Sequence, residues 1–392
     1  MRILLANFTK MVNESGGMAK VTCAFANEMV SRGHKVSLVY CDEREGDFYY
    51  PVDPSVSCFD LRKIDGKRVK FPLIQKIKRE VYRLFDKSKA EGVRLSFYNR
   101  VLSEYCGKLL EDIKPDVIIS SNVNTSAILL CTLKTRIPVI TMSHGNVLQY
   151  YVDYPEDSVK SIELSVINQV LLNSYAEQMK EHSPKSKVVV IGNAIQQYEF
   201  SADLSGKKNQ YKVVWVGKLN KKNKQPHILI QAFAEVADRY PNWTLELWGD
   251  KHGEVYYKHL QSIISKNNLE DRIFLKGTTK EIPNILKGAD IFAFPSAAEG
   301  FPLALGEGMS AGLPVIGFKS CTGVNELIND GIDGFLCDDG VDNFAAALDK
   351  LMGDQELRVK MGKAAKNSIA KYVPNLIWDK WESLIKSVVP KE

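Results

Sequence analysis

Residues 294–309 read Phe294-Pro295-Ser296-Ala297-Ala298-Glu299-Gly300-Phe301-Pro302-Leu303-Ala304-Leu305-Gly306-Glu307-Gly308-Met309. An apolar strand is expected to end at Pro295, and a helix to begin near Pro302, because proline is favoured in the first helical turn. The loop between them delivers Glu299, and Glu307 follows within the helix. Carboxylates accept hydrogen bonds from hydroxyl groups, and the free N–H groups of a helix start can hold phosphate. The alternative, a capping glutamate followed by an exposed one, is weakened by the apolar neighbours.

The same strand–loop–helix order recurs along the chain. Short apolar runs that alternate with amphipathic stretches are typical of α/β proteins with parallel sheets. Strands are expected at residues 2–6, 35–40, 116–120, 138–142 and 187–191, and then at 211–216, 243–248, 272–276, 290–294 and 314–318. Helices are expected between them, for example at 17–32 and 225–239. We therefore predict two α/β domains, at residues 1–195 and 211–372, joined by a linker at 196–210 and followed by an amphipathic helix within 373–392.

Composition excludes several classes of protein. The chain has 392 residues, of which 45% are hydrophobic and 25% charged, as in ordinary globular proteins. Its net charge of +5 is too small for a dedicated nucleic-acid binder, so no nucleic-acid partner is expected. The seven cysteines form no C-x-x-C pair and no zinc spacing, and no apolar run is long enough for a membrane span or a signal peptide. A cytoplasmic protein with reduced thiols is expected.

Three other loops follow predicted strands, where ligands of open α/β sheets bind. Gly16-Gly17 precedes a helix and could hold a phosphate, or it could simply be a flexible turn. His144 could bond a substrate hydroxyl or be satisfied by nearby backbone. Residues 217–224 contain Lys218, Lys221, Lys222 and Lys224, which could bind phosphate or form a solvated charge run. The residues alone leave these alternatives open.

In their order and spacing these motifs resemble family 4 of the retaining glycosyltransferases, of the type that builds bacterial surface polysaccharides. The most specific part is the E-x(7)-E motif of Glu299 and Glu307, and residues 311–316 and 323–328 also fit. The resemblance covers essentially the whole chain. It implies the α/β fold called GT-B, with two Rossmann-like domains that face a central cleft. The N-terminal domain would bind the acceptor, the C-terminal domain would bind a nucleotide sugar, and the last helix would return to the N-terminal domain.

The resemblance also implies roles for single residues. Glu299 would bind hydroxyls of the donor sugar, Glu307 the ribose, and Lys218 with Lys224 the diphosphate. His144 would contact the donor sugar at its C6 side. The other donor-binding residues would be Gly16, Gly17, Gly217, Lys222, Gly300, Phe301 and Leu303.

Two features, one residue and one loop length, depart from the family pattern. Lys218 stands where arginine is more common, so bidentate phosphate contact is lost. The loop from Lys218 to Lys224 is one residue longer than usual, which makes Lys222 a possible substitute for Lys224. Pro302 has no N–H to donate, although proline is common there among relatives.

The expected reaction moves a hexose or N-acetylhexosamine from a UDP- or GDP-sugar, with UDP favoured, to a glycan or lipid-linked acceptor. Fixed positive groups would neutralise the departing diphosphate. No D-x-D sequence for a divalent ion is present, so no metal and no other cofactor are expected. Whether Glu299 attacks the sugar or only positions it stays open. A sugar-nucleotide 2-epimerase of the same fold and a non-catalytic sugar-nucleotide-binding subunit are the alternatives.

A basic segment at residues 62–94 contains twelve basic and four acidic residues, a net charge of +8. Within it, apolar residues recur at helical spacing from Leu73 to Phe85. A basic amphipathic helix is typical of an element that lies on an anionic membrane surface. The alternative is that the apolar stripe packs on the first domain while the lysines are solvated.

Overall fold

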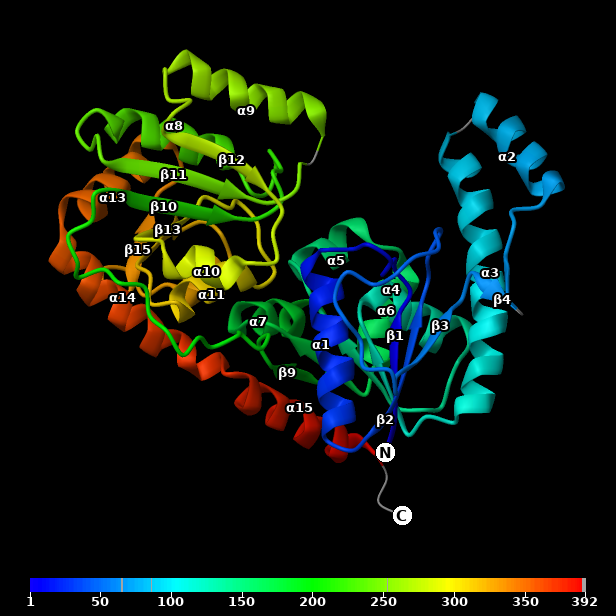
Figure 1. The fold of residues 1–392 in the computed structure, drawn as a ribbon. Coiled ribbons are helices and arrows are strands. Elements are labelled where there is room, and N and C mark those ends of the chain that lie inside the picture. The colour runs from blue at the N-terminus through cyan, green and yellow to red at the C-terminus, as the bar shows by residue number, and fades with distance from the viewer. Residues whose placement is uncertain (65, 86, 252, 390–392) are drawn as a thin grey trace. The chain divides into compact units, whose positions relative to one another are not determined.

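The computed structural model describes residues 1–64, 66–85, 87–251 and 253–389 (Figure 1). The chain forms two compact units. Unit 1 comprises Met1–Ile191 together with Asp379–Glu392, and unit 2 comprises Gly192–Trp378. The first segment of unit 1 thus ends at Ile191, whereas the sequence analysis expects the first domain to end at residue 195.

Unit 1 is built on a seven-stranded parallel sheet in the order β3-β2-β1-β6-β7-β8-β9. Its strands are β1 (Arg2–Asn7), β2 (Lys35–Tyr40), β3 (Ser57–Asp60), β6 (Val117–Ser120), β7 (Val139–Met142), β8 (Ile167–Val170) and β9 (Val188–Val190). Its helices are α1 (Gly17–Ser31), α2 (Leu73–Phe85), α3 (Lys87–Ile113), α4 (Val123–Ala127), the π-helical η1 (Ile128–Thr132), α5 (Leu148–Asp153), α6 (Glu156–Leu164) and α7 (Asn173–His182). A small antiparallel hairpin of β4 (Lys63–Ile64) and β5 (Lys67–Arg68) precedes α2.

Unit 2 is built on a six-stranded parallel sheet in the order β12-β11-β10-β13-β14-β15. Its strands are β10 (Tyr211–Val216), β11 (Trp243–Trp248), β12 (Ile273–Gly277), β13 (Ile291–Phe294), β14 (Val315–Phe318) and β15 (Gly334–Cys337). Its helices are α8 (Pro226–Ala237), α9 (Glu254–Lys266), α10 (Ile282–Lys287), α11 (Leu303–Ser310), α12 (Val324–Leu327), α13 (Val341–Gly353), α14 (Gln355–Ile369), the 3-10 helix η2 (Ala370–Tyr372) and the first part of α15 (Pro374–Val388). Parallel strands joined through helices confirm the predicted α/β class.

Three strands of the large sheets were not predicted. β8 has the sequence Ile-Asn-Gln-Val, whose polar centre does not look like a buried strand. Both polar side chains are nevertheless buried, because Asn168 Nδ2 donates to Ile162 O (2.7 Å) and Gln169 Nε2 donates to Ile191 O (2.5 Å). β3 lies at a sheet edge and is partly exposed, and β15 begins with glycine, so neither shows a clear apolar run.

Helix α15 returns to unit 1, as expected. Trp381 is buried and meets the ring of Phe25 on α1 edge to face, with centroids 5.0 Å apart. Arg32, at the end of α1, donates to Asp379 (2.7 Å) and to Glu382 (3.0 Å). Hydrogen bonds from Lys386 and Arg32 lower the pKa of Glu382 to about 2. The contact therefore combines a buried aromatic pair with an ion-pair network.

A search of the described helices finds none that is both long and apolar enough to span a bilayer.

Candidate active site

The sheet of unit 2 brings three loops together at the carboxyl ends of neighbouring strands. β10 lies between β11 and β13, and β13 pairs with β14. The loops after β10, β13 and β14 therefore leave the same edge of the sheet, where ligands of such folds bind. The first holds Lys218, Lys222 and Lys224, and the second holds Glu299.

Lys224 and Glu299 form a direct ion pair. Lys224 Nζ lies 2.5 Å from Glu299 Oε1, and the two side chains are 26% and 8% exposed. The same Nζ lies 5.4 Å from the centroid of the Phe294 ring. Two opposite charges this close and this poorly solvated hold each other in place, because losing either partner leaves an uncompensated buried charge.

The two loops that carry this pair are also joined through their backbones. The Ala297 N–H donates to the Asn223 carbonyl (2.8 Å). Asn220 closes the lysine loop, since its carbonyl accepts from the N–H groups of Lys224 (3.2 Å) and Gln225 (3.0 Å). Gln225 takes a positive φ of 46° directly before α8. Lys224 thus sits on a fixed turn at the start of a helix.

Of the loop lysines proposed from the sequence, Lys224 forms an ion pair with Glu299. Lys222 is exposed, and Lys218 is half-buried. Lys224 therefore lies beside Glu299, and the possible substitution of Lys222 for Lys224 at the diphosphate stays a prediction.

Two glycines set the close approach of the loops after β10 and β11. A Cβ on Gly217 would lie 2.9 Å from the ring of Trp215. A Cβ on Gly249, whose φ is +151°, would lie 1.6 Å from the Gly217 carbonyl oxygen. Only glycine fits at position 249. The sequence reasoning missed this residue, although a glycine directly after a predicted strand was a usable signal.

Helix α11 places Glu307 in the interior of unit 2. Glu307 is 9% exposed. The pKa of Tyr198 is raised by the burial of Tyr198 and by the nearby negative charge of Glu307. A Cβ on Gly308 would lie 2.7 Å from Phe292, so α11 packs closely on β13. Pro302 precedes α11, and Leu303 is its first residue, as expected. The Leu303 N–H is already bonded to the Phe301 carbonyl (2.9 Å).

Phe301 and Cys321 are buried side chains near Glu299. The Phe301 ring is buried and meets Tyr372 edge to face, with centroids 5.1 Å apart. Gly300 lies between Glu299 and this anchored ring. Cys321, in the loop after β14, is fully buried, and burial with the nearby Glu299 charge raises the pKa of its thiol to about 12. This cysteine is therefore a neutral packing residue.

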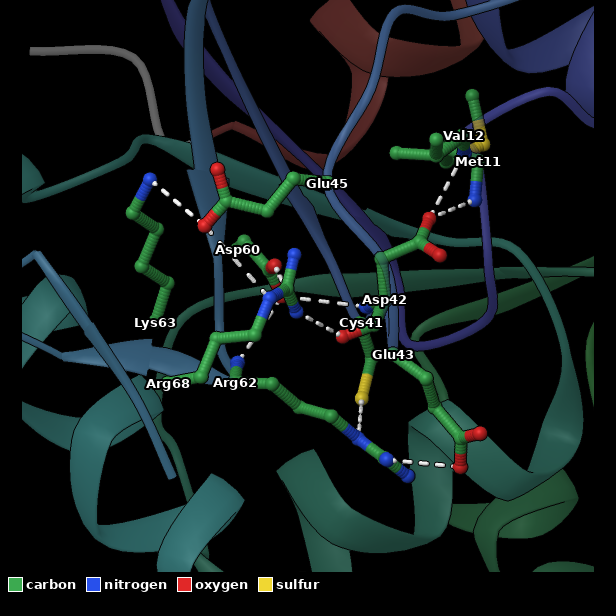
Figure 2. Close-up of polar contacts among 10 residues, drawn as sticks. All are labelled: Met11, Val12, Cys41, Asp42, Glu43, Glu45, Asp60, Arg62, Lys63 and Arg68. Carbon is green, nitrogen blue, oxygen red and sulfur yellow. Dashed lines mark hydrogen bonds and ion pairs between the residues drawn. The ribbon is translucent and has the colours of Figure 1, made fainter. Parts of the chain in front are cut away.

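In unit 1, the loop between β1 and α1 ends at Gly16, the N-cap of α1, and Gly17, its first residue. Asp42 fixes this loop, since its Oδ2 accepts from the N–H groups of Met11 (2.6 Å) and Val12 (2.7 Å) (Figure 2). Farther along, the Gly16 N–H donates to Glu14 Oε1 (3.0 Å). Two carboxylates therefore hold the glycine loop, Asp42 at its middle and Glu14 next to α1.

Figure 2 shows what supports Asp42 itself. Its N–H donates to Asp60 Oδ1 (3.1 Å), and Arg68 donates to its carbonyl (2.7 Å). Arg68 also reaches Asp60 Oδ2 (3.3 Å). Through Arg68, the β4–β5 hairpin thereby stabilises the carboxyl end of the sheet, where the glycine loop follows β1. Sequence reasoning counted Arg68 in the basic segment and missed this structural role.

His144 follows β7 and is neutral at pH 7. Burial lowers its pKa to about 4, and its Nε2 is buried with no hydrogen-bond partner among the described residues. A neutral imidazole with one unpartnered nitrogen can donate to or accept from a ligand hydroxyl, depending on its tautomer. Within the described residues, a search for three or more metal-ligating side chains in one place finds none.

Two family models together match most of the chain. Residues 15–196 match the model described as Glycosyltransferase Family 4, and residues 196–368 match the one described as Glycosyl transferases group 1. The chain belongs to glycosyltransferase family 4. Its E-x(7)-E motif lies within the second match, on the loop and helix that carry Glu299 and Glu307.

Curated glycosyltransferases are similar along all or part of the chain. The amylovoran biosynthesis glycosyltransferase AmsD of Erwinia amylovora is 24% identical over 382 residues, which cover 95% of this chain and 97% of AmsD. An Escherichia coli protein named UDP-Gal:alpha-D-GlcNAc-diphosphoundecaprenol alpha-1,3-galactosyltransferase is 31% identical over 215 residues, 54% of this chain and 50% of that protein. The chain spans only 18% of an exopolysaccharide phosphotransferase of Streptomyces coelicolor, at 31% identity.

Solved glycosyltransferases share the fold over nearly the full length. TarM of S. aureus, in a complex that contains UDP, has a TM-score of 0.76 at 14% identity, with 98% of this chain and 99% of that chain covered. The lipopolysaccharide outer core galactosyltransferase WaaB has a TM-score of 0.72 at 17% identity, with 99% of each covered. At this identity the likeness shows the fold alone, and it confirms the expected GT-B architecture.

Proposed function

We propose that this glycosyltransferase moves a hexose or N-acetylhexosamine from a UDP-sugar to a glycan or lipid-linked acceptor, with retention of configuration, in the synthesis of a bacterial surface polysaccharide. The observation that carries the proposal is the Lys224–Glu299 pair at the carboxyl ends of β10 and β13. The UDP bound in TarM and the undecaprenol-linked acceptor in the name of the E. coli relative agree with this choice of donor and acceptor. We place the reaction in the cytoplasm, at the inner face of the membrane.

The pair assigns complementary tasks to its two members. The diphosphate of a bound donor offers Lys224 a second acceptor, which frees a Glu299 oxygen for hydroxyls of the donor sugar. As the bond to the sugar breaks, negative charge grows on the diphosphate, and a fixed ammonium in a poorly solvated site stabilises it. Glu307 would hold the ribose, and His144, neutral at pH 7, would bond a sugar hydroxyl without adding charge.

We propose that no divalent ion takes part, since Lys218, Lys224 and the first turn of α11 supply positive charge for the diphosphate. Transfer should then continue at full rate in excess EDTA. Activity that disappears with EDTA and returns with Mg²⁺ or Mn²⁺ would refute this part of the proposal.

The experiment that tests the function is a sugar-nucleotide panel with the purified chain. The correct donor should raise the melting temperature by mass action, and Glu299→Gln should bind it while losing transfer by about 100-fold. Full activity of Glu299→Gln would remove Glu299 from the chemistry. Incubation with UDP-N-acetylglucosamine alone separates the alternative, because a 2-epimerase would convert it without an acceptor.

A further inference from the structure

Helix α2 turns an apolar face to solvent. Its large apolar side chains are mostly exposed: Leu73 (76%), Ile74 (78%), Ile77 (62%), Val81 (51%) and Phe85 (84%). Their spacing places them on one side of the helix. A helix of a globular domain normally buries such a face, and a contiguous exposed one marks an interaction surface.

The opposite, polar side of α2 is the one that meets the protein. α2 packs on α3, and Gln75 and Arg79 are half-buried there. Phe71, just before α2, meets Phe97 of α3 with ring centroids 5.3 Å apart, and the Arg79 guanidinium lies 5.7 Å from the Phe71 ring. The alternative in which the apolar stripe packs on the first domain is therefore wrong for α2.

Helix α2 has a net charge of +3, because it carries Lys76, Lys78, Arg79 and Arg83 against the single acid Glu80. Glu80 pairs with Arg79 (2.7 Å) and Arg83 (3.6 Å), and Lys76 and Lys78 are exposed. Other basic residues of segment 62–94 are already paired within unit 1, such as Arg62 with Glu43 (2.9 Å) and Arg68 with Asp60 (3.3 Å). Residues Lys87, Lys89 and Arg94 have side chains outside the described set. Figure 1 shows α2 beyond the strands of unit 1, on the first half of α3.

We propose that α2 docks on an anionic lipid surface, with its apolar face inserted at the headgroup boundary and its lysines at the level of the phosphates. Exposed apolar residues flanked by basic ones are the composition of helices that lie in the membrane interface. A second copy of this chain would bring +3 against +3, so charge complementarity favours the lipid. The inference goes beyond glycosyl transfer and requires neither donor nor acceptor.

The test uses the full chain and vesicles of pure phosphatidylcholine or of phosphatidylcholine with phosphatidylglycerol, separated by sedimentation. Strong binding is expected only to the anionic vesicles. Ile74→Ser/Ile77→Ser should weaken the partition by more than about 30-fold through loss of inserted carbon. Lys76→Gln/Lys78→Gln should weaken it by about 25-fold, since each basic residue near the surface contributes about fivefold.

A matched control lies on α9 of unit 2. Val255 is 86% exposed, and Lys258 is exposed on the same helix, so Val255→Ser/Lys258→Gln removes the same kinds of group elsewhere. This variant should bind like the parent chain. Circular dichroism melts show whether each variant folds, which separates lost docking from lost structure.

Three outcomes would overturn the proposal: no binding of the parent chain to anionic vesicles, binding that the α2 variants retain, or an equal loss in the α9 control. A fourth would replace it. If light scattering shows a dimer that Ile74→Ser/Ile77→Ser dissociates, and vesicles are not bound, α2 is a self-association surface. None of these results depends on which sugar nucleotide the protein uses.

Discussion

At the scale of single residues, the close approach of the loops after β10 and β11 depends on Gly249. Gly249→Ala would place a methyl group 1.6 Å from the Gly217 carbonyl oxygen in a backbone conformation that favours glycine. We expect a loss of about 3 kcal/mol or more in the stability of unit 2. Gly277→Ala is the matched control, because its φ is also positive (+75°) but no atom lies within 4 Å, and it should cost only about 1–2 kcal/mol. Equal losses in urea unfolding would contradict the clash.

His144 gives a second prediction at this scale. Its pKa is about 4 in the folded protein and about 6.5 in an unfolded chain, so the unfolded state binds the proton first as pH falls. The stability that His144 contributes is therefore complete above about pH 6.5 and declines toward pH 4. His144→Gln should flatten this decline. His34 and His227 have pKa values lowered in the same direction, so part of the slope should remain. An unchanged slope in the variant would show that His144 is already protonated in the folded state near pH 6.

At the scale of elements, the loop between β1 and α1 depends on Asp42. Asp42→Ala removes the carboxylate oxygen that accepts from the N–H groups of both Met11 and Val12, and Met11 is buried. We expect a loss of about 2–3 kcal/mol in unit 1 and faster hydrogen exchange at these two amides. Glu45→Ala, which removes a mostly exposed partner of Lys63 and Arg68, should change stability by less than about 1 kcal/mol. Unchanged exchange at Met11 and Val12 in Asp42→Ala would show that the loop is held by other contacts.

The elements also show how far the sequence could predict this fold. β2, β10 and β11 have the predicted bounds because each is a clear apolar run between breakers. β8 was missed because burial of Asn168 and Gln169 requires partners from residues 162 and 191, which no local pattern reveals. Local sequence predicts a strand well where burial of its own apolar side chains stabilises it. It predicts a strand poorly where buried polar side chains are satisfied by hydrogen bonds to backbone groups distant in sequence.

The candidate site likewise has features that local sequence reveals and features that depend on distant residues. The acids and lysines could be selected from the sequence because they follow strands and match a family motif. That Lys224, rather than Lys222, meets Glu299 depends on the Asn220 turn and on the Ala297–Asn223 backbone bond. Gly249 was missed because the group that excludes a side chain there, the Gly217 carbonyl, belongs to another loop. The alternative in which the apolar face of α2 packs on the first domain was wrong because that face is exposed to solvent.

At the scale of the whole molecule, α15 joins the two units in sequence, and its second half is anchored on unit 1. Trp381→Ala removes a side chain that is 2% exposed and packed on Phe25, so we expect unit 1 to lose about 3–5 kcal/mol. Leu376→Ala, on the same helix but 51% exposed, should change stability by less than about 0.5 kcal/mol. Unfolding should be followed with a probe confined to unit 1, because a chain of two units need not unfold in one step. Similar losses in both variants would mean that the Trp381 contact is not what anchors α15.

The central claim is that Lys224 binds the diphosphate of the donor, and the affinity for UDP measured by titration calorimetry tests it most directly. The comparison is between Glu299→Gln and Glu299→Gln/Lys224→Met, since neither protein leaves a buried carboxylate unpaired, with Lys222→Met as the control in the same loop. We predict that adding Lys224→Met weakens UDP binding by at least about 10-fold, the value of a charge-assisted hydrogen bond, and that Lys222→Met changes it by less than about twofold. Equal affinity of the two Glu299 variants, or a larger loss in Lys222→Met, would contradict the account.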